Sequence, residues 1–288
     1  MERRFTISCA QLGPGDEAKE GNLKRILDLI RVAGERGSQL TVFPELALTP
    51  YFCSKNLRDA FERYFDPIPN RYLDQVQAAA RDARTAVVVG LGEAEGPAYY
   101  NTATVVGADG SLLGKYRKVH IPAGFPRSSE GATTYEKMYF RPGNLGFPVF
   151  NLGPTTLGVQ ICYDRQFPEG FRCLALAGAE IIAVPTNMAT YESKWRGHTW
   201  ELVLRTRAFE NSLFIAGVNK AGQEWGREYV GSSLIASPLG GDLVAKAATD
   251  GDEVVTATVD LADTLEATKR LPFARDRRPD QYGPLIGA

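Results

Sequence analysis

A cysteine at position 162 lies where the sequence predicts the end of a strand and the start of a helix. Residues 157–161 alternate and are rich in apolar types, which is typical of a strand. Asp164 can cap a turn, and Pro168 with Glu169 is a common way for a helix to begin. A helix N-terminus lowers the pKa of a thiol and offers backbone N–H groups to an oxyanion. The position therefore suits a nucleophile, although a free cysteine is more often a simple core residue.

A cysteine nucleophile needs a base, and histidine is that base in papain-like enzymes. The chain has two histidines, His120 and His198. His198 falls within a helical pattern at 195–210, which favours a surface or packing role. Neither histidine has a cysteine at the spacing of zinc ligands, so the sequence predicts no metal site.

Two carboxylates and a lysine remain as partners for the thiol. Glu45 follows a short apolar strand. Lys118 ends a predicted strand at 112–118, where alternation directs its side chain to the inner face. Glu136 lies in a long loop at 121–146, and loops of that length are usually functional or disordered. A carboxylate base and a lysine beside a thiol could activate it as a nucleophile.

Composition excludes several classes of partner. The chain has 288 residues, with 33 basic and 34 acidic side chains and a formal net charge of −1. No field of either sign would attract nucleic acid or an anionic membrane. Apolar content of 44 % and charged content of 23 % are ordinary for a soluble globular protein. We therefore expect a small-molecule ligand rather than a nucleic acid.

Cysteine usage and the N-terminal sequence bear on localisation. Cys9, Cys53, Cys162 and Cys173 are far apart, which is typical of reduced thiols in a cytoplasmic protein. The N-terminus begins with an alternating run instead of the apolar block of a signal peptide. No apolar run approaches the roughly 18 residues of a membrane span. We expect a cytoplasmic protein without a membrane anchor.

The order of predicted elements indicates the fold class. Strands and helices alternate, with hairpins between them, which is typical of an α/β protein with layered sheets and helices. One strand ends in Pro44-Glu45 and a later one ends in Pro185-Thr186-Asn187, each after a helix. This echo predicts two related halves.

Taken together, these segments resemble the carbon-nitrogen hydrolase family, or nitrilase superfamily, whose members place a Glu, a Lys and a Cys at the ends of successive strands. The matching motifs are TVFPELALTPY around Glu45, GKYRKVHIP around Lys118 and GVQICYDRQFPE around Cys162. YEKMYFRPGNLGFPVF carries Glu136, which resembles the second glutamate of that family. The resemblance spans nearly the whole chain, from CAQLG near the start to the terminal region.

The resemblance implies an α/β fold of one domain, residues 1–288, built as a four-layer α-β-β-α sandwich of nitrilase type with two pseudo-symmetric halves. It also implies no cofactor and association into homodimers or homotetramers. The C-terminal tail from about residue 271 is expected at the interface between copies.

The resemblance also implies a role for each site residue. Glu45 would take the thiol proton and Cys162 would attack the carbonyl carbon. The ammonium of Lys118 and the backbone N–H of Tyr163 would stabilise the oxyanion. Glu136 would hold Lys118 and the substrate nitrogen in place, and water would hydrolyse the thioester.

Within the family, the segment after the nucleophile resembles N-carbamoyl-amino-acid amidohydrolases. Arg165 matches the arginine that those enzymes direct at the substrate carboxylate, which suits a bidentate guanidinium. Asn187 matches an asparagine of the D-carbamoylase pocket wall. The segments GNLGFPVF and CYDR resemble β-ureidopropionase instead. Both resemblances imply that the substrate is a ureido acid, which the enzyme would cleave to an amino acid, CO2 and ammonia.

Three residues depart from the D-carbamoylase pattern: Gln166 stands where a second arginine is usual, and Thr134 and Tyr135 stand where histidines are usual. A simple nitrilase is disfavoured, because those enzymes show Cys-Trp-Glu where this chain has Cys-Tyr-Asp. N-carbamoylputrescine amidase, or another aliphatic amidase, is the alternative within the family, although Arg165 would repel a cationic substrate. A non-catalytic binding module on the same fold is the alternative of another class.

Overall fold

Three neighbouring parallel strands lie at the centre of the first sheet, β1, β2 and β4. Antiparallel strands extend the sheet on both sides, with β15 beside β1 and the β4–β5–β6 meander on the other edge. A two-residue strand, β3, pairs with the far end of β4. The bounds are β1 Arg4–Gln11, β2 Leu40–Val42, β3 Phe65–Asp66, β4 Ala86–Glu95, β5 Ala98–Val106, β6 Leu112–Arg117 and β15 Glu253–Asp260.

The second sheet repeats this plan, with the parallel strands β8, β9 and β10 at its centre. Strand β7 is antiparallel to β8 at one edge, and β13 and β14 continue the other edge. A separate hairpin pairs β11 with β12. The bounds are β7 Val149–Asn151, β8 Thr156–Val159, β9 Ile181–Thr186, β10 Phe214–Asn219, β11 Ala221–Glu224, β12 Arg227–Val230, β13 Leu234–Ala236 and β14 Leu243–Lys246.

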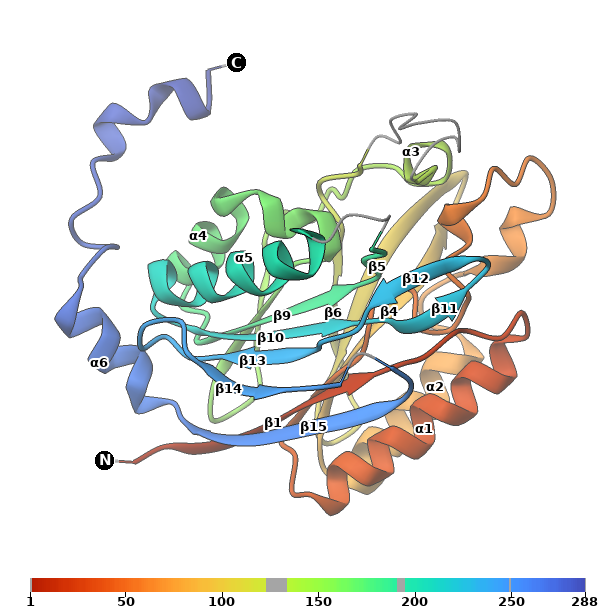
Figure 1. Ribbon diagram of the computed structural model, residues 1–288, viewed down its shortest axis with the longest axis horizontal. Helices are drawn as coiled ribbons and strands as arrows, with labels where there is room; N and C mark the ends of the chain where they lie inside the picture. The colour runs from red at the N-terminus through yellow and green to blue at the C-terminus, as the bar shows by residue number, and fades with distance from the viewer. Residues whose placement is uncertain (1, 123–133, 191–194, 249, 288) are drawn as a thin grey trace.

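The two sheets face each other across one apolar core, to which β1, β2 and β4 contribute from one side and β8, β9 and β10 from the other. Helices α1 (Lys19–Glu35) and α2 (Arg71–Ala83) cover the outer face of the first sheet. Helices α4 (Pro168–Leu176) and α5 (Trp195–Asn211) cover that of the second. Figure 1 shows the helical pairs on opposite sides of the sheets. The computed structural model, which describes residues 2–122, 134–190, 195–248 and 250–287, thus confirms the α-β-β-α sandwich with two similar halves.

Helix boundaries follow local sequence signals. Asn70 caps α2, because its side-chain oxygen accepts hydrogen bonds from the backbone N–H groups of Tyr72 at 3.0 Å and Leu73 at 2.9 Å. Pro168 occupies the first turn of α4, as its sequence predicts. Strands β3, β7, β11 and β12, of two to four residues, were not expected from the sequence, because runs this short display little alternation; β2 is equally short but was expected from its apolar residues.

An aromatic cluster supports the region after β2. Phe52 lies at its centre and stacks on Tyr64 with ring centroids 4.6 Å apart. Tyr139 and Phe140 pack on Phe52 from the short helix α3 (Glu136–Tyr139) and the residue after it. The cluster therefore fixes the part of the predicted 121–146 loop that carries Glu136; residues 123–133 of that loop lie outside the described residues.

The chain ends in helix α6 (Ala262–Arg270), followed by a tail with two short 3₁₀ turns at Pro279–Gln281 and Gly283–Leu285. In Figure 1 this tail, in dark blue, runs away from the sandwich. Its apolar side chains are exposed, with 64 % of Leu285 and 91 % of Ile286 accessible. Phe273 makes an edge-on contact with Phe209 of α5 at a centroid distance of 5.6 Å.

Truncation of the core between the sheets should destabilise the fold. Leu157 on β8 is fully buried in that core, so Leu157→Ala should lower the free energy of unfolding in urea by about 2–5 kcal/mol. The matched control is Leu176→Ala at the end of α4, where the leucine is 50 % exposed and the expected change is about 0.5 kcal/mol or less. Equal losses in both variants would contradict the assignment of the core.

Candidate active site

Glu45 lies three residues beyond the end of β2 and is fully buried. Its Oε1 accepts hydrogen bonds from Lys118 Nζ at 2.7 Å and Asn101 Nδ2 at 2.7 Å, and its Oε2 accepts one from the Asn187 backbone N–H at 3.0 Å. A Cβ added at Gly90 of β4 would lie 2.8 Å from Glu45 Cα, so glycine is required there. Three donors from separate strands or strand ends hold this carboxylate in one orientation.

Lys118 directly follows β6 and is also fully buried. Its ammonium donates to Glu45 Oε1 at 2.7 Å and to Glu136 Oε2 at 2.6 Å. Burial lowers the pKa of Lys118, but the charges of Glu136 and Glu45 outweigh it and raise the pKa well above its ordinary value. The lysine is therefore a fixed cation between two carboxylates at neutral pH.

Glu136 is the first residue of α3 and is 1 % exposed. Its second oxygen, Oε1, accepts a hydrogen bond from the Tyr51 hydroxyl at 2.6 Å. Burial raises the pKa of Glu136; the charge of Lys118 acts against that rise, and the charge of Glu45 adds to it. The two glutamates therefore repel each other, and the charge of the lysine between them stabilises both carboxylates in their ionised form.

Cys162 is the first residue of a 3₁₀ turn, Cys162–Gln166, that follows β8. Its φ of 47° is in the left-handed region, which is rare for a residue other than glycine. Burial, followed by the charge of Glu45, raises the pKa of its thiol to about 12, against the lowering effects of Lys118 and Arg165. The sequence-based expectation of a lowered pKa is therefore wrong, because the helix-terminus argument took no account of desolvation.

Arg165 lies one turn after the cysteine and is 5 % exposed. Its Nη1 donates to the Cys162 carbonyl at 2.7 Å and lies 3.6 Å from the thiol sulfur. Its Nη2 lies 2.8 Å from Met188 Sδ, and the guanidinium is 5.8 Å from the centre of the Trp200 ring. Within the described part of the chain, no carboxylate forms an ion pair with this guanidinium.

Asn187 and Tyr163 are the remaining residues predicted from the sequence. Asn187 Nδ2 donates to the Glu45 carbonyl at 2.7 Å, so this asparagine holds the backbone as well as the carboxylate of Glu45. Its Oδ1 is buried and has no hydrogen-bond partner among the described residues. Tyr163 is half-buried and meets Phe167 edge-on at 5.3 Å. The structure thus brings Asn187 to the glutamate and Tyr163 next to the cysteine.

Sequence analysis missed two residues of this cluster, Asn101 and Tyr51. Asn101 lies within β5 and reaches Glu45 across the sheet. Tyr51 lies in the loop after β2, and its hydroxyl reaches Glu136, which is 85 positions away in sequence. A buried polar residue within an apolar strand is the one available signal for Asn101, whereas nothing local indicates a role for Tyr51.

No group of three or more His, Cys, Asp or Glu side chains capable of holding a metal occurs in the described segments. In the cluster itself, an ammonium occupies the space between the two carboxylates that a cation would need. No helix among the described residues is long and apolar enough to cross a membrane.

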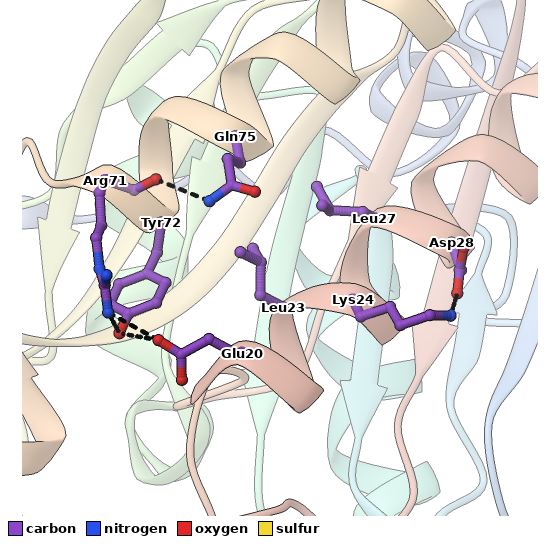
Figure 2. Close-up of a pocket in the computed structure, with 8 residues that line it drawn as sticks. All are labelled: Glu20, Leu23, Lys24, Leu27, Asp28, Arg71, Tyr72 and Gln75. Carbon is purple, nitrogen blue, oxygen red and sulfur yellow. Dashed lines mark hydrogen bonds and ion pairs between the residues drawn. The ribbon is translucent and has the colours of Figure 1, made fainter. Parts of the chain in front are cut away.

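A surface pocket between α1 and α2 lies on the outer side of the first sheet (Figure 2). Its polar side chains pair with one another: Arg71 Nη2 donates to Glu20 Oε1 at 2.7 Å, and Lys24 Nζ donates to Asp28 Oδ2 at 2.8 Å. Figure 2 shows the two pairs on either side of Leu23 and Leu27, the apolar residues that line the pocket between them. Because its charges are already paired, this pocket lacks the converging polar groups of the Glu45–Lys118–Cys162 region.

Comparison with known proteins identifies the family. The model of the carbon-nitrogen hydrolase family matches residues 6–269. A nitrilase from Pyrococcus abyssi is 35 % identical over 282 residues, which cover 96 % of this chain and 98 % of that protein. A citrullinase from Francisella tularensis is 33 % identical over 298 residues, which cover 97 % of both proteins.

Two further matches have the same extent. An N-carbamoylputrescine amidase from Oryza sativa is 32 % identical over 296 residues, covering 98 % of this chain and 95 % of that protein. A crystal structure of a carbon-nitrogen hydrolase from Helicobacter pylori matches with a TM-score of 0.88 and 29 % identity, covering 100 % of this chain and 99 % of that one. The resemblance noted in the motifs is confirmed: the chain belongs to the carbon-nitrogen hydrolase family and is a hydrolase of amide-type carbon-nitrogen bonds.

Proposed function

We propose that this enzyme hydrolyses an N-carbamoyl amino acid to the amino acid, CO2 and ammonia. The observation that carries the proposal is the buried guanidinium of Arg165, which lies 3.6 Å from the thiol sulfur and hydrogen-bonds to no carboxylate of the described chain. A buried cation is stable when an anion pairs with it. The carboxylate of a ureido acid bound at the thiol supplies that anion.

The names of two relatives are consistent with a ureido substrate, because N-carbamoylputrescine and citrulline both contain the ureido group. We also propose a cytoplasmic location, because a thiol nucleophile has to stay reduced and cysteines remain reduced in the cytoplasm. N-carbamoylputrescine itself is the second candidate. Its free end is a cation, which Arg165 would repel, so we favour a substrate that ends in a carboxylate.

In the proposed reaction, Glu45 removes the thiol proton as Cys162 attacks the ureido carbon. The thiol is neutral at neutral pH, so proton transfer accompanies the attack. A carbon-sulfur bond forms, and a carbon-nitrogen bond then breaks as the protonated Glu45 returns the proton to the departing ammonia. Water, activated by Glu45, breaks the carbon-sulfur bond and releases a carbamate, which gives CO2 and the amino acid.

Charge that develops on the substrate oxygen needs fixed donors. We assign this role to the Lys118 ammonium and the backbone N–H of Tyr163, which directly follows the nucleophile. Glu136 holds the lysine from the opposite side to Glu45, with an Oε2–Nζ distance of 2.6 Å, and directs the substrate nitrogen. Because all three charged side chains are buried, their positions do not change when the charge develops.

The Arg165 assignment predicts a selective loss of binding. Arg165→Ala should raise KM for N-carbamoyl amino acids by about 10- to 100-fold, the value of a hydrogen bond between charged groups. KM for a neutral amide should change less than about threefold, since that substrate has no carboxylate. The measurement is ammonia release from N-carbamoyl-D-, L- and β-amino acids, a plain amide, a nitrile and N-carbamoylputrescine.

Cys162→Ala is the blank for this panel, and Arg205→Ala on α5 is the matched arginine control. Activity on one ureido acid series, lost in the blank, would establish the reaction and its stereochemistry together. Equal effects of Arg165→Ala on acids and neutral amides would remove Arg165 as the carboxylate partner. Ammonia release that survives Cys162→Ala would remove Cys162 as the nucleophile, and no release from any compound would favour a binding module that has kept the fold.

The pKa of about 12 for the Cys162 thiol gives a second test. Below that pKa the thiol is protonated, so the free enzyme should show no thiolate absorbance step between about pH 6 and 10. The measurement is the far-ultraviolet difference between the wild type and Cys162→Ala, in which tyrosines and the other cysteines cancel. A step near the unperturbed pKa of about 8.5 would show that burial does not control this thiol.

The proposed oligomer, a homodimer or homotetramer, rests on the exposed apolar tail. Light scattering should give a smaller assembly for a chain that ends at Arg270 than for the full chain, because the tail side chains Phe273, Leu285 and Ile286 lose their contacts with a second copy. A chain that ends at Ile286 keeps those side chains and is the control. Unchanged mass after truncation at Arg270 would place the interface elsewhere.

A further inference from the structure

We infer that Asp164 is a positioning residue that holds the nucleophile turn and the lysine strand in one fixed arrangement, an inference that rests on the proposed function. Asp164 lies two residues after Cys162 and is fully buried. In the described structure it has no ion-pair partner other than His120. A buried carboxylate is costly unless it is hydrogen-bonded, so its partners indicate what it holds in place.

Four hydrogen bonds converge on this carboxylate. Oδ2 accepts from the Ile161 backbone N–H at 3.0 Å and from the Tyr116 hydroxyl at 2.8 Å. Oδ1 accepts from the His120 backbone N–H at 2.8 Å and lies 2.7 Å from His120 Nδ1. The donors come from the residue before the nucleophile and from two residues that flank Lys118.

The first consequence concerns the cysteine. Its left-handed backbone, with a φ of 47°, persists only where the surrounding structure holds it. Asp164 closes the turn that contains Cys162, because its carboxylate accepts from Ile161 N–H while its own backbone N–H donates to the Ile161 carbonyl at 3.0 Å. The peptide groups between Ile161 and Asp164, to which the Tyr163 N–H belongs, thus lie within one hydrogen-bonded turn.

The second consequence concerns the lysine. Tyr116 lies in β6 two positions before Lys118, and His120 lies two positions after it, beyond the end of the strand. The bonds from Tyr116 and His120 to one carboxylate attach this segment to the nucleophile turn at two points. The separation between the attacking sulfur and the Lys118 ammonium is then set through Asp164.

Aromatic packing secures the same arrangement. The His120 ring stacks on Phe167 with centroids 3.7 Å apart and an interplanar angle of 7°. Phe167 in turn meets Tyr163 edge-on. His120, one of two histidines that could have served a thiol, thus contacts the aspartate instead.

Asp164→Asn tests the inference, since an amide has one acceptor oxygen and its NH2 group would face donors that now bind the carboxylate. We expect kcat to fall about 100-fold, comparable to the loss of one oxyanion donor, with KM within about threefold of wild type. The substrate is whichever compound of the ammonia-release panel is cleaved best. Inhibition by the aldehyde that corresponds to the amide of the panel, which forms a tetrahedral adduct with the thiol, should weaken by the same factor as kcat/KM for that amide.

Three variants complete the experiment. Tyr116→Phe removes one donor without changing charge, and His120→Ala keeps the backbone bond but loses the ring; each should lower kcat about tenfold in a folded protein. Asp252→Asn, which alters a hydrogen-bonded carboxylate that accepts from Gly13 N–H at 2.7 Å, is the matched control with unchanged kcat.

The outcomes separate this inference from the proposed function. Wild-type kcat in Asp164→Asn, or in both Tyr116→Phe and His120→Ala, would overturn it while Cys162→Ala remains inactive. A rise in KM with unchanged kcat would also overturn it, since that pattern indicates substrate contact. Failure of the proposed function would appear instead as the absence of ureido acid cleavage, with the Asp164 series still measurable on an amide.

Discussion

The ammonium of Lys118 lies between the carboxylates of Glu45 and Glu136 in a space that solvent does not reach. Removal of one partner from a buried ion pair typically lowers the free energy of unfolding by about 3–5 kcal/mol, because the remaining charge is left buried without an opposite charge. The three side chains therefore have to arrive together, from β2, β6 and the loop that contains α3. Much of the surrounding structure, from Gly90 to the aromatic cluster around Phe52, keeps those three segments in register.

Burial, with the charged trio, explains the state of the thiol. Burial removes the water that would stabilise a thiolate, and the charge of Glu45 raises the pKa of Cys162 further, against the lowering effect of Lys118. In our proposal the enzyme therefore keeps a neutral nucleophile until a substrate is present. Arg165 supplies a further positive charge 3.6 Å from the sulfur, where it lowers the pKa of the thiol and, in our proposal, binds the carboxylate of the substrate. One guanidinium would thus affect both the pKa of the thiol and the binding of the substrate carboxylate.

Much of this site could be predicted from sequence because it consists of strand ends. The ends of predicted strands indicate Glu45, Lys118 and Cys162 as candidates, and the family motifs unite them with Glu136. Their contacts could not be predicted, since Tyr51 and Asn101 reach the cluster through tertiary structure alone. The pKa of Cys162 was predicted in the wrong direction for the same reason: a local helix terminus is visible in sequence, whereas burial is not.

The place of each part of the site in the fold bears on how reaction and recognition are divided between them. Glu45, Lys118 and Cys162 follow strands of two sheets whose cores pack on each other, so none can move without disturbing both sheets. Relatives at 32–35 % identity have names as different as nitrilase, citrullinase and N-carbamoylputrescine amidase. One fold can carry such a range when the reacting groups are fixed by the core and the substrate is selected by side chains outside it. Arg165 lies at the boundary between these parts, in the turn that begins at Cys162, and for that reason our proposal assigns it the choice of substrate while Glu45, Lys118 and Cys162 carry the reaction.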